Sequence, residues 1–164
     1  MRTIVISLAV TVFAAAAVAQ QGATEGVKTY SSATDVTALQ AKAKSDRKGD
    51  APLVVERILQ LPPYNANLEY RASIGPASIH EKEAEIFYVI DGGGTMVTGG
   101  KLQNEKRTNA ENLSGSGIEG GTPRKLAKGD FFIVPENTPH WFSSLDGSIT
   151  LMSLHVPRTT GGTH

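Results

Sequence analysis

Short runs of β-prone residues, separated by glycine, proline and asparagine, follow one another through the chain after Pro52. In the run 67–74, apolar residues at every second position alternate with polar ones, as in a strand with one buried face. This spacing is typical of an all-β sandwich or barrel, and neither a fixed repeat nor a parallel βαβ pattern is present. We therefore predict strands at 53–59, 67–74, 77–80, 85–90, 95–98, 124–126, 130–134, 140–144 and 148–156.

Glycine-containing segments between these runs predict the connections. Residues 91–94 and 146–147 are expected to be hairpin turns, because glycine supplies the positive φ that such turns require. Residues 99–123 are polar, contain six glycines and are long for a loop in a compact domain. We expect either a lid over a ligand or a surface excursion that contacts a dimer partner. As a lid it would carry Lys101, Asn104, Arg107 or Asn109 to the ligand.

The N-terminal residues have the order of features expected of a secretory signal peptide. Arg2 precedes an apolar stretch, which ends in Ala17-Val18-Ala19 immediately before Gln20. The stretch is short for a membrane span, so we expect cleavage and a soluble periplasmic or secreted protein. A buried N-terminal helix is the alternative. The predicted organisation is a signal peptide at 1–19, a flexible N-terminus with a short helix at 20–50, a barrel domain at 51–158 and a disordered tail at 159–164.

The helix within that N-terminal segment is predicted at 34–47. Thr34 or Asp35 is the expected cap, and Gly49 and Pro52 are expected to stop the helix. Its apolar stripe is thin, which predicts a helix on the surface.

Charge and cysteine content limit the classes of partner. The chain carries sixteen Lys and Arg against sixteen Asp and Glu, so no large basic field favours nucleic acid or an anionic membrane. We therefore expect neither partner after cleavage. An exported protein could form disulfides, but this chain has no cysteine, so its stability must come from packing or a bound metal.

Two short segments carry the candidate chemistry. The first places His80 five residues before Glu85, which lies seven residues before Gly92. The second places Gly129, Pro135 and His140 in one run, with Asn137 between the last two. Asparagine tolerates the left-handed conformation better than other non-glycine residues, so it can occupy a turn position that usually holds glycine.

Taken in chain order, these two segments resemble the first and second sequence motifs of the cupin superfamily. The departures are Ser78 in place of the first histidine of the usual His-x-His pair, Asn137 in place of a glycine and Ser144 in place of the final asparagine. The leading glycine of the first motif also lacks a match at the usual distance. The resemblance covers about residues 53–156. It implies an antiparallel β-barrel of the jelly-roll type, also called a double-stranded β-helix, with a divalent metal in its mouth.

The residues support a metal site independently of the family. His80 ends one predicted strand, Glu85 begins the next, and His140 follows the predicted turn 136–139. Two imidazoles and one carboxylate form a ligand set that leaves positions open for water or substrate. We predict these three residues as ligands of Zn, Mn, Fe or Ni, with Zn slightly favoured because its affinity for such sites exceeds that of Mn and Fe.

Neighbouring side chains complete the predicted pocket. Ser78 could hold a metal-bound water, and Glu81 or Glu83 could supply a fourth ligand. Phe87 and Phe142 share strand parity with the ligands and are expected to form an apolar wall.

We predict structural roles for His155 and Trp141. His155 could point inward, but we predict a histidine at the edge of the core. Trp141 should face away from His140, in an apolar layer outside the pocket or in a dimer contact.

The favoured function is an exported metal-dependent cupin enzyme acting on a small organic molecule, with isomerase, lyase and dioxygenase chemistry all open. No catalytic residue is assigned. Glu81, Glu83 and Tyr88 are candidates for proton transfer, although Tyr88 has the strand parity opposite to Glu85. The alternative is a non-catalytic cupin that binds a sugar or an acid. We expect a homodimer formed through the edge strand at 53–59.

Processing of the N-terminus is the first testable prediction. Mass spectrometry of the protein from its native host should find a mature N-terminus at Gln20 or Gln21, because cleavage follows Ala17-Val18-Ala19. A soluble cytoplasmic form that retains Met1 would contradict export.

Overall fold

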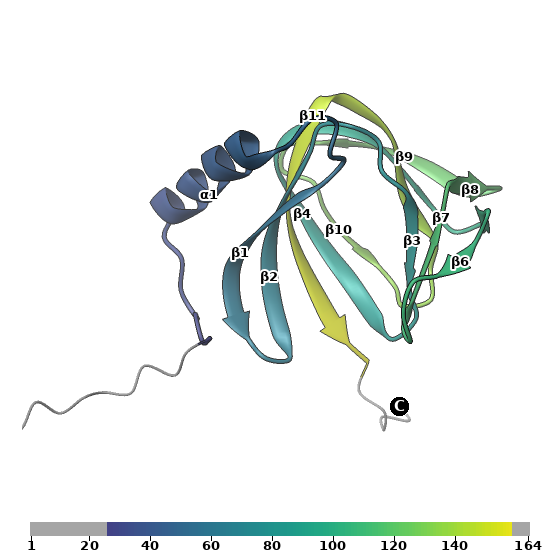
Figure 1. Cartoon of the computed structure of the whole chain (residues 1–164), viewed down its shortest axis with the longest axis horizontal. Helices are drawn as coiled ribbons and strands as arrows, with labels where there is room; N and C mark the ends of the chain where they lie inside the picture. Colours follow the sequence, from purple (N-terminus) through teal and green to yellow (C-terminus); the bar gives the residue numbers. More distant parts are fainter. Residues whose placement is uncertain (1–25, 159–164) are drawn as a thin grey trace, which may run out of the picture.

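The computed structural model describes residues 26–158. The predicted signal peptide at 1–19 and the predicted tail at 159–164 lie outside the described residues. Residues 26–158 form one helix and eleven strands, arranged as a barrel with the helix on its outside (Figure 1). The elements are α1 (Ala33–Asp46), β1 (Val54–Leu61), β2 (Tyr64–Arg71), β3 (Ala77–His80), β4 (Glu83–Thr98), β5 (Lys101–Gln103), β6 (Lys106–Arg107), β7 (Asn112–Gly115), β8 (Gly117–Glu119), β9 (Thr122–Ala127), β10 (Phe131–Val134) and β11 (His140–Pro157).

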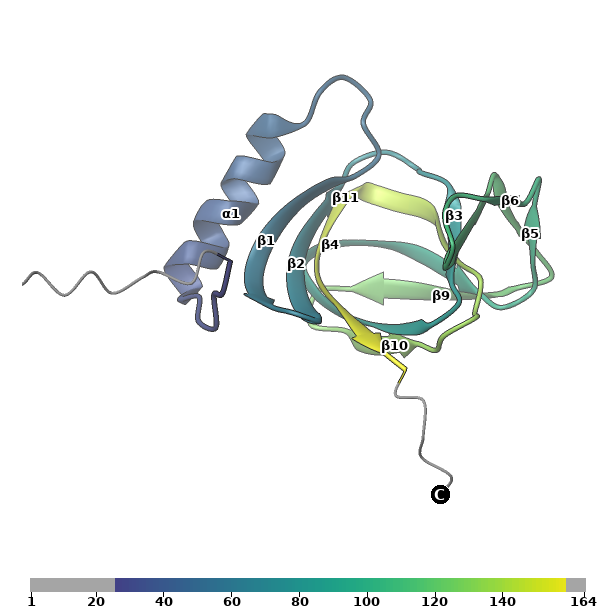
Figure 2. The same cartoon turned by 60° about the horizontal axis from the view of Figure 1, so that its bottom comes forward.

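The barrel consists of two facing antiparallel layers that share the long strands β4 and β11. The C-terminal half of β11 pairs with β2 and with the N-terminal half of β4, and β1 and β10 extend this layer. The N-terminal half of β11 pairs with β3 and with the C-terminal half of β4, and β7 and β9 extend the other layer. Viewed from its end, the molecule shows these strands surrounding a common interior (Figure 2). The all-β jelly-roll prediction is therefore confirmed.

The predicted hairpin turns at 91–94 and 146–147 are wrong, because both segments lie inside continuous strands. The register of β11 on β4 shifts between Leu145 and Ile149, so the residues between them form a bulge. Gly92 and Gly147 each have φ +78°. Positive φ therefore bends the two strands from one layer into the other instead of reversing the chain.

Helix α1 covers the outer face of the layer that contains β1 and β2 (Figure 1). The predicted caps are wrong: Ser32 is the N-cap, and Asp35 is its partner in a capping box. The helix also ends at Asp46, slightly earlier than predicted. Ala43 of the helix is buried in one cluster with Ile58, Ala66 and Leu68, which lie on the outer face of the sheet. The helix therefore packs against the wall opposite to the barrel interior.

The predicted loop at 99–123 contains four short strands. β5 pairs with β8, β6 pairs with β7, and β7 continues the sheet beside β3. Ser78 of β3 lies opposite Ser114 of β7 in this register. The segment thus extends one wall of the barrel. Its strands are short and interrupted by glycine, but β7 still pairs with β3 along its length.

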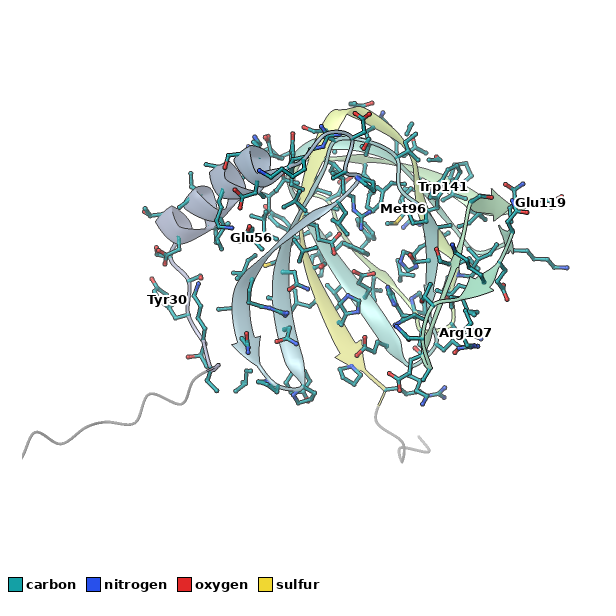
Figure 3. The ribbon with its side chains drawn as sticks, in the orientation of Figure 1. Tyr30, Glu56, Met96, Arg107, Glu119 and Trp141 are labelled. Atoms are coloured by element: carbon teal, nitrogen blue, oxygen red, sulfur yellow. The ribbon has the colours of Figure 1, made fainter. Side chains whose placement is uncertain are left out.

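The second core cluster fills the closed end of the barrel. Phe87 is 1% exposed and stacks on Phe132 with ring centroids 5.0 Å apart, while Phe142 meets Phe87 edge-on at 6.3 Å. Met96, labelled in Figure 3, belongs to the same cluster and is 2% exposed. The aromatic side chains predicted to line the pocket therefore form its apolar floor.

Trp141 lies on the other face of β11 from His140, as its parity predicted. Its Nε1 donates a hydrogen bond to the carbonyl oxygen of Gly75 at 2.9 Å, and its ring lies near Gly117. This places Trp141 between the barrel and the excursion that carries β5–β8 (Figure 3).

The predicted dimer edge, β1, has a partial neighbour within the chain. Lys28 and Gln60 exchange two backbone hydrogen bonds of 2.7 and 2.8 Å, which cover part of the outer edge of β1. Dimerisation stays a prediction. Within residues 26–158 the only helix is too short and too polar to cross a membrane.

The bend in β4 gives a stability prediction with a matched control. A Cβ on Gly92 would lie 2.1 Å from the carbonyl oxygen of Ser148, whereas a Cβ on Gly147 would meet nothing within 4 Å, although both residues have φ +78°. Gly147→Ala should cost about 1–2 kcal/mol from backbone strain alone. Gly92→Ala should cost about 1–3 kcal/mol more, because a backbone carbonyl must also move.

Thermal unfolding of both variants checks this account. Each kcal/mol corresponds to about 2–4 °C in Tm for a chain of this size. Equal melting temperatures for the two variants would show that the close approach of β4 and β11 at Gly92 is not a structural constraint.

Candidate metal centre

Three strands bring four chemically active side chains to the open end of the barrel. His80 is the last residue of β3, and Glu85 lies near the start of β4. His155, near the end of β11, lies directly opposite Glu85 in the β11–β4 register. His140 begins the same strand β11 and lies opposite Ser78.

The three imidazoles converge on one buried carboxylate. Glu85 is 4% exposed. Its Oε2 lies 3.5 Å from His80 Nε2 and 3.4 Å from His140 Nε2, and its Oε1 lies 3.3 Å from His155 Nε2. The ring centroid of His80 is 5.2 Å from that of His140 and 4.8 Å from that of His155. One donor atom from each of His80, Glu85 and His155 lies within 4.8 Å of the others.

The opposite ring nitrogens fix the tautomers of two histidines. His140 Nδ1 lies 3.1 Å from the carbonyl oxygen of Thr138, and His155 Nδ1 lies 3.0 Å from Glu83 Oε2. A carbonyl and a carboxylate can only accept, so both Nδ1 atoms carry a hydrogen and donate it. When these imidazoles are neutral, their Nε2 lone pairs therefore point towards Glu85.

The third histidine is held in the same way. His80 Nδ1 lies 2.6 Å from Asn112 Oδ1, and Asn112 Nδ2 donates to Asn109 Oδ1 at 3.0 Å. The second bond orients the amide so that its oxygen faces His80. Both asparagines belong to the segment 99–123, which was predicted to be a long loop, and this segment orients a predicted metal ligand.

These contacts fit a metal site. Charge-assisted N–H···O bonds are usually about 2.7–2.9 Å long, whereas the three Nε2–carboxylate distances are all longer than this. Two ligands bound at about 2.0–2.2 Å in a tetrahedral arrangement lie about 3.3–3.6 Å apart. Lone pairs that face a carboxylate repel it unless a cation lies between them. The donor set of imidazole nitrogens and one carboxylate oxygen suits Zn, Fe, Ni and related divalent ions.

Electrostatics inside the cluster follow from its burial and its charges. Burial opposes ionisation of Glu85, but the three neighbouring histidines outweigh it and hold the pKa of the carboxyl far below its usual range. Burial also opposes protonation of His80, yet Glu85 and Asn112 raise its pKa above the usual value. Glu85 is the main cause of the raised pKa of His155, and the charges of Glu83 and Glu69 raise it further.

The structure brings the three predicted ligands His80, Glu85 and His140 together and adds His155. Sequence reasoning placed His155 at the edge of the core, and the structure corrects this. The available signal was the parity of His155 with Leu151 and Ser153, which are both buried. Motif spacing could not reveal it, because His155 lies eleven residues beyond Ser144, the last position of the second motif.

The other predicted pocket residues have different positions. Ser78 shares a strand face with His80 and lies opposite His140. Glu81, a candidate fourth ligand, instead binds both terminal nitrogens of Arg107, at 2.7 and 3.0 Å. Tyr88 is 39% exposed on the outer face of β4, opposite the exposed Phe131, so its hydroxyl faces away from the cluster.

Comparisons with known proteins agree with this architecture. The sequence profile of the cupin family matches residues 55–156. No curated protein matches the chain significantly. The DMSP lyase DddQ from Ruegeria pomeroyi DSS-3 is similar in structure, with a TM-score of 0.51 and 16% identity over 84% of this chain and 70% of that one.

Two further solved structures have lower similarity scores. A cupin superfamily protein from Desulfitobacterium hafniense DCB-2 gives a TM-score of 0.47 and 10% identity over 71% of this chain and 87% of that one. The Fe(II) form of HppE gives 0.47 and 17% over 63% of this chain and 49% of that one. HppE has also been solved with Co(II). At 16% identity, the likeness to DddQ establishes a shared fold.

A barrel of this topology, with histidines and a carboxylate converging in its mouth, defines a cupin domain. Because the family profile covers more than half of the chain, the protein belongs to the cupin family.

Metal content gives the prediction that follows from this geometry. Glu85→Gln and His155→Ala should each weaken the affinity for metal by about tenfold or more. The control His164→Ala removes a histidine outside the described residues and should leave the affinity unchanged. Elemental analysis after equilibrium dialysis measures this, and thermal unfolding checks that each variant folds. Full metal content in both cluster variants would refute the site.

The pH dependence has a defined sign. Because Glu85 raises the pKa of His80 and of His155, protons compete with metal at pH values above the ordinary histidine range as well as within it. Affinity should therefore fall as pH is lowered from about 8 to 6, and acidification should release metal. An affinity that does not change over this interval would contradict ligation by these imidazoles.

Proposed function

We propose that this chain is an exported, metal-dependent cupin enzyme that acts on a small organic molecule. His80, Glu85, His140 and His155 would hold the metal in the mouth of the barrel. The observation that carries this proposal is the convergence of three Nε2 atoms on one buried carboxylate at 3.3–3.5 Å.

The residues of the chain have distinct tasks in this proposal. A bound metal would supply Lewis-acid chemistry that polarises an oxygen of the substrate. Asn112, Thr138 and Glu83 accept hydrogen bonds from the Nδ1 atoms and so orient the three imidazoles. Phe87 and Phe142 form an apolar floor below the cluster and would close that side to water, so the metal would be reached from the mouth. Zn remains slightly favoured on affinity, with Fe, Mn and Ni as the other candidates.

A non-catalytic binding role is the second candidate, and one observation favours it. Each side chain considered for proton transfer is engaged or directed elsewhere: Glu81 pairs with Arg107, Glu83 accepts from His155, and Tyr88 lies on the outer face. An enzyme would then have to move protons through groups on the substrate or through the cluster itself. A binding protein has no such requirement.

The proposal includes export of the chain and a barrel domain at residues 51–158. The predicted cleavage after Ala19 would release a mature chain whose barrel, at 51–158, folds outside the cytoplasm and acquires its metal there. The absence of cysteine is compatible with that route, because folding does not depend on disulfide formation.

Protein purified from its native compartment separates the two functions. The enzyme proposal expects about one divalent metal per chain, with a water that exchanges on the metal, measured by elemental analysis and by proton relaxation of the Mn(II)-loaded protein. Mass spectrometry of released small molecules is done on the same sample. A folded, metal-free barrel that retains an organic ligand would contradict the enzyme and support the binding role.

A further inference from the structure

Strand β2 contributes a polar wall to the interior of the barrel. Asn67 lies opposite Ser153, and Glu69 lies opposite Leu151, so these residues face the same side of the sheet as His155. Arg71 continues this face at the end of β2. Such polar groups are unusual in a barrel interior unless they are paired or bind a ligand.

Two groups hold the guanidinium of Arg71, the carboxylate of Glu69 and the ring of Phe142. Its Nε and Nη2 both donate to Glu69 Oε2, at 3.1 and 2.7 Å. The other oxygen of Glu69 accepts a 2.7 Å hydrogen bond from Ser153, which is fully buried. The guanidinium also lies over the ring of Phe142, 4.6 Å from its centroid. Glu69 and Phe142 therefore orient the guanidinium, and Ser153 in turn holds Glu69 in place.

Two polar atoms on this wall have no partner in residues 26–158. Arg71 Nη1 makes no hydrogen bond there and is reached by solvent, and the side chain of Arg71 is 18% exposed. Asn67 Oδ1 is buried and accepts no hydrogen bond from the described residues. Buried polar atoms are nearly always satisfied, so an unsatisfied acceptor on the same strand face as an oriented cation indicates a ligand that supplies the missing partners.

The wall is close to the metal centre. Phe142, below the guanidinium, is two residues from His140 on one face of β11, and Ser153, which holds Glu69, is two residues from His155. Residues i and i+2 on a strand lie about 7 Å apart. A molecule with a backbone of a few atoms could therefore contact the metal centre at one end and Arg71 at the other.

We propose that the ligand is a small hydroxy acid, whose carboxylate binds Arg71 Nη1 and whose hydroxyl donates to Asn67 Oδ1. This inference rests on the proposed function, since the remaining end of the molecule would face the metal. Glu69 compensates the charge of Arg71 and orients its guanidinium, which makes Glu69 a positioning residue. An ion pair that served only to stabilise the barrel would not require an unpaired guanidinium edge or an unsatisfied Asn67.

The test measures binding of matched probes to the full mature chain, with and without metal. D-gluconate carries a carboxylate and hydroxyls, D-sorbitol lacks the carboxylate, and hexanoate lacks the hydroxyls. Titration calorimetry should give a Kd for D-gluconate at least about tenfold lower than for either analogue. Equal affinities for the three probes, or no binding of D-gluconate at millimolar concentration, would overturn the proposal.

Variants then assign the contacts. The double variant E69Q/R71Q removes both charges without leaving a buried carboxylate unpaired, and it should weaken D-gluconate about tenfold or more while leaving D-sorbitol unchanged. Asn67→Leu should weaken D-gluconate but not hexanoate. The control K125Q/D146N removes an exposed ion pair in the same way and should leave the affinity for D-gluconate unchanged. Melting temperature and metal content are measured for every variant.

The outcomes separate this inference from the metal proposal. If the chain binds no metal but still binds D-gluconate through Arg71, the metal-dependent function fails and the acid subsite stands. If metal binds normally and E69Q/R71Q retains the D-gluconate affinity of the unmodified chain, the subsite is refuted and the metal centre stands.

Discussion

Three imidazole nitrogens directed at one buried carboxylate are the constraint on which the mouth of this barrel depends. Each ring is oriented from behind: two Nδ1 atoms donate to groups that can only accept, and the third faces an asparagine oxygen. The lone pairs that remain face Glu85, which is 4% exposed and ionised. Such an arrangement is stable only with a cation in its centre, either protons on the imidazoles or a metal ion.

The bend in β11 makes this convergence geometrically accessible. His140 and His155 are fifteen residues apart on one strand, yet both lie within 3.5 Å of Glu85. The strand runs from the mouth to the closed end, bends near Gly147 and returns in the facing layer, and β4 bends beside it at Gly92. The apolar cluster at the closed end fixes the two layers, so the ligands depend on the core for their positions.

Much of the fold was predictable because the alternation of apolar and polar residues reflects which face of each strand is buried. Glycine-containing segments between these runs marked most places where one strand gives way to the next. The tolerance of Asn137 for a left-handed conformation was also predicted, and its φ is +56°. The hairpins at 91–94 and 146–147 were not, since positive φ at glycine serves bulges as well as turns. His155 was missed because its role depends on a bend far along β11. Glu81 was misplaced because its partner, Arg107, comes from a segment whose strands were not recognised.

Anomalous diffraction from crystals of the metal-loaded protein tests the central claim most directly. The account predicts one strong anomalous peak about 2.0–2.3 Å from the Nε2 atoms of His80, His140 and His155 and from a carboxylate oxygen of Glu85. A peak elsewhere on the molecule, or a fully loaded crystal in which these imidazoles keep their distance from the ion, would contradict it.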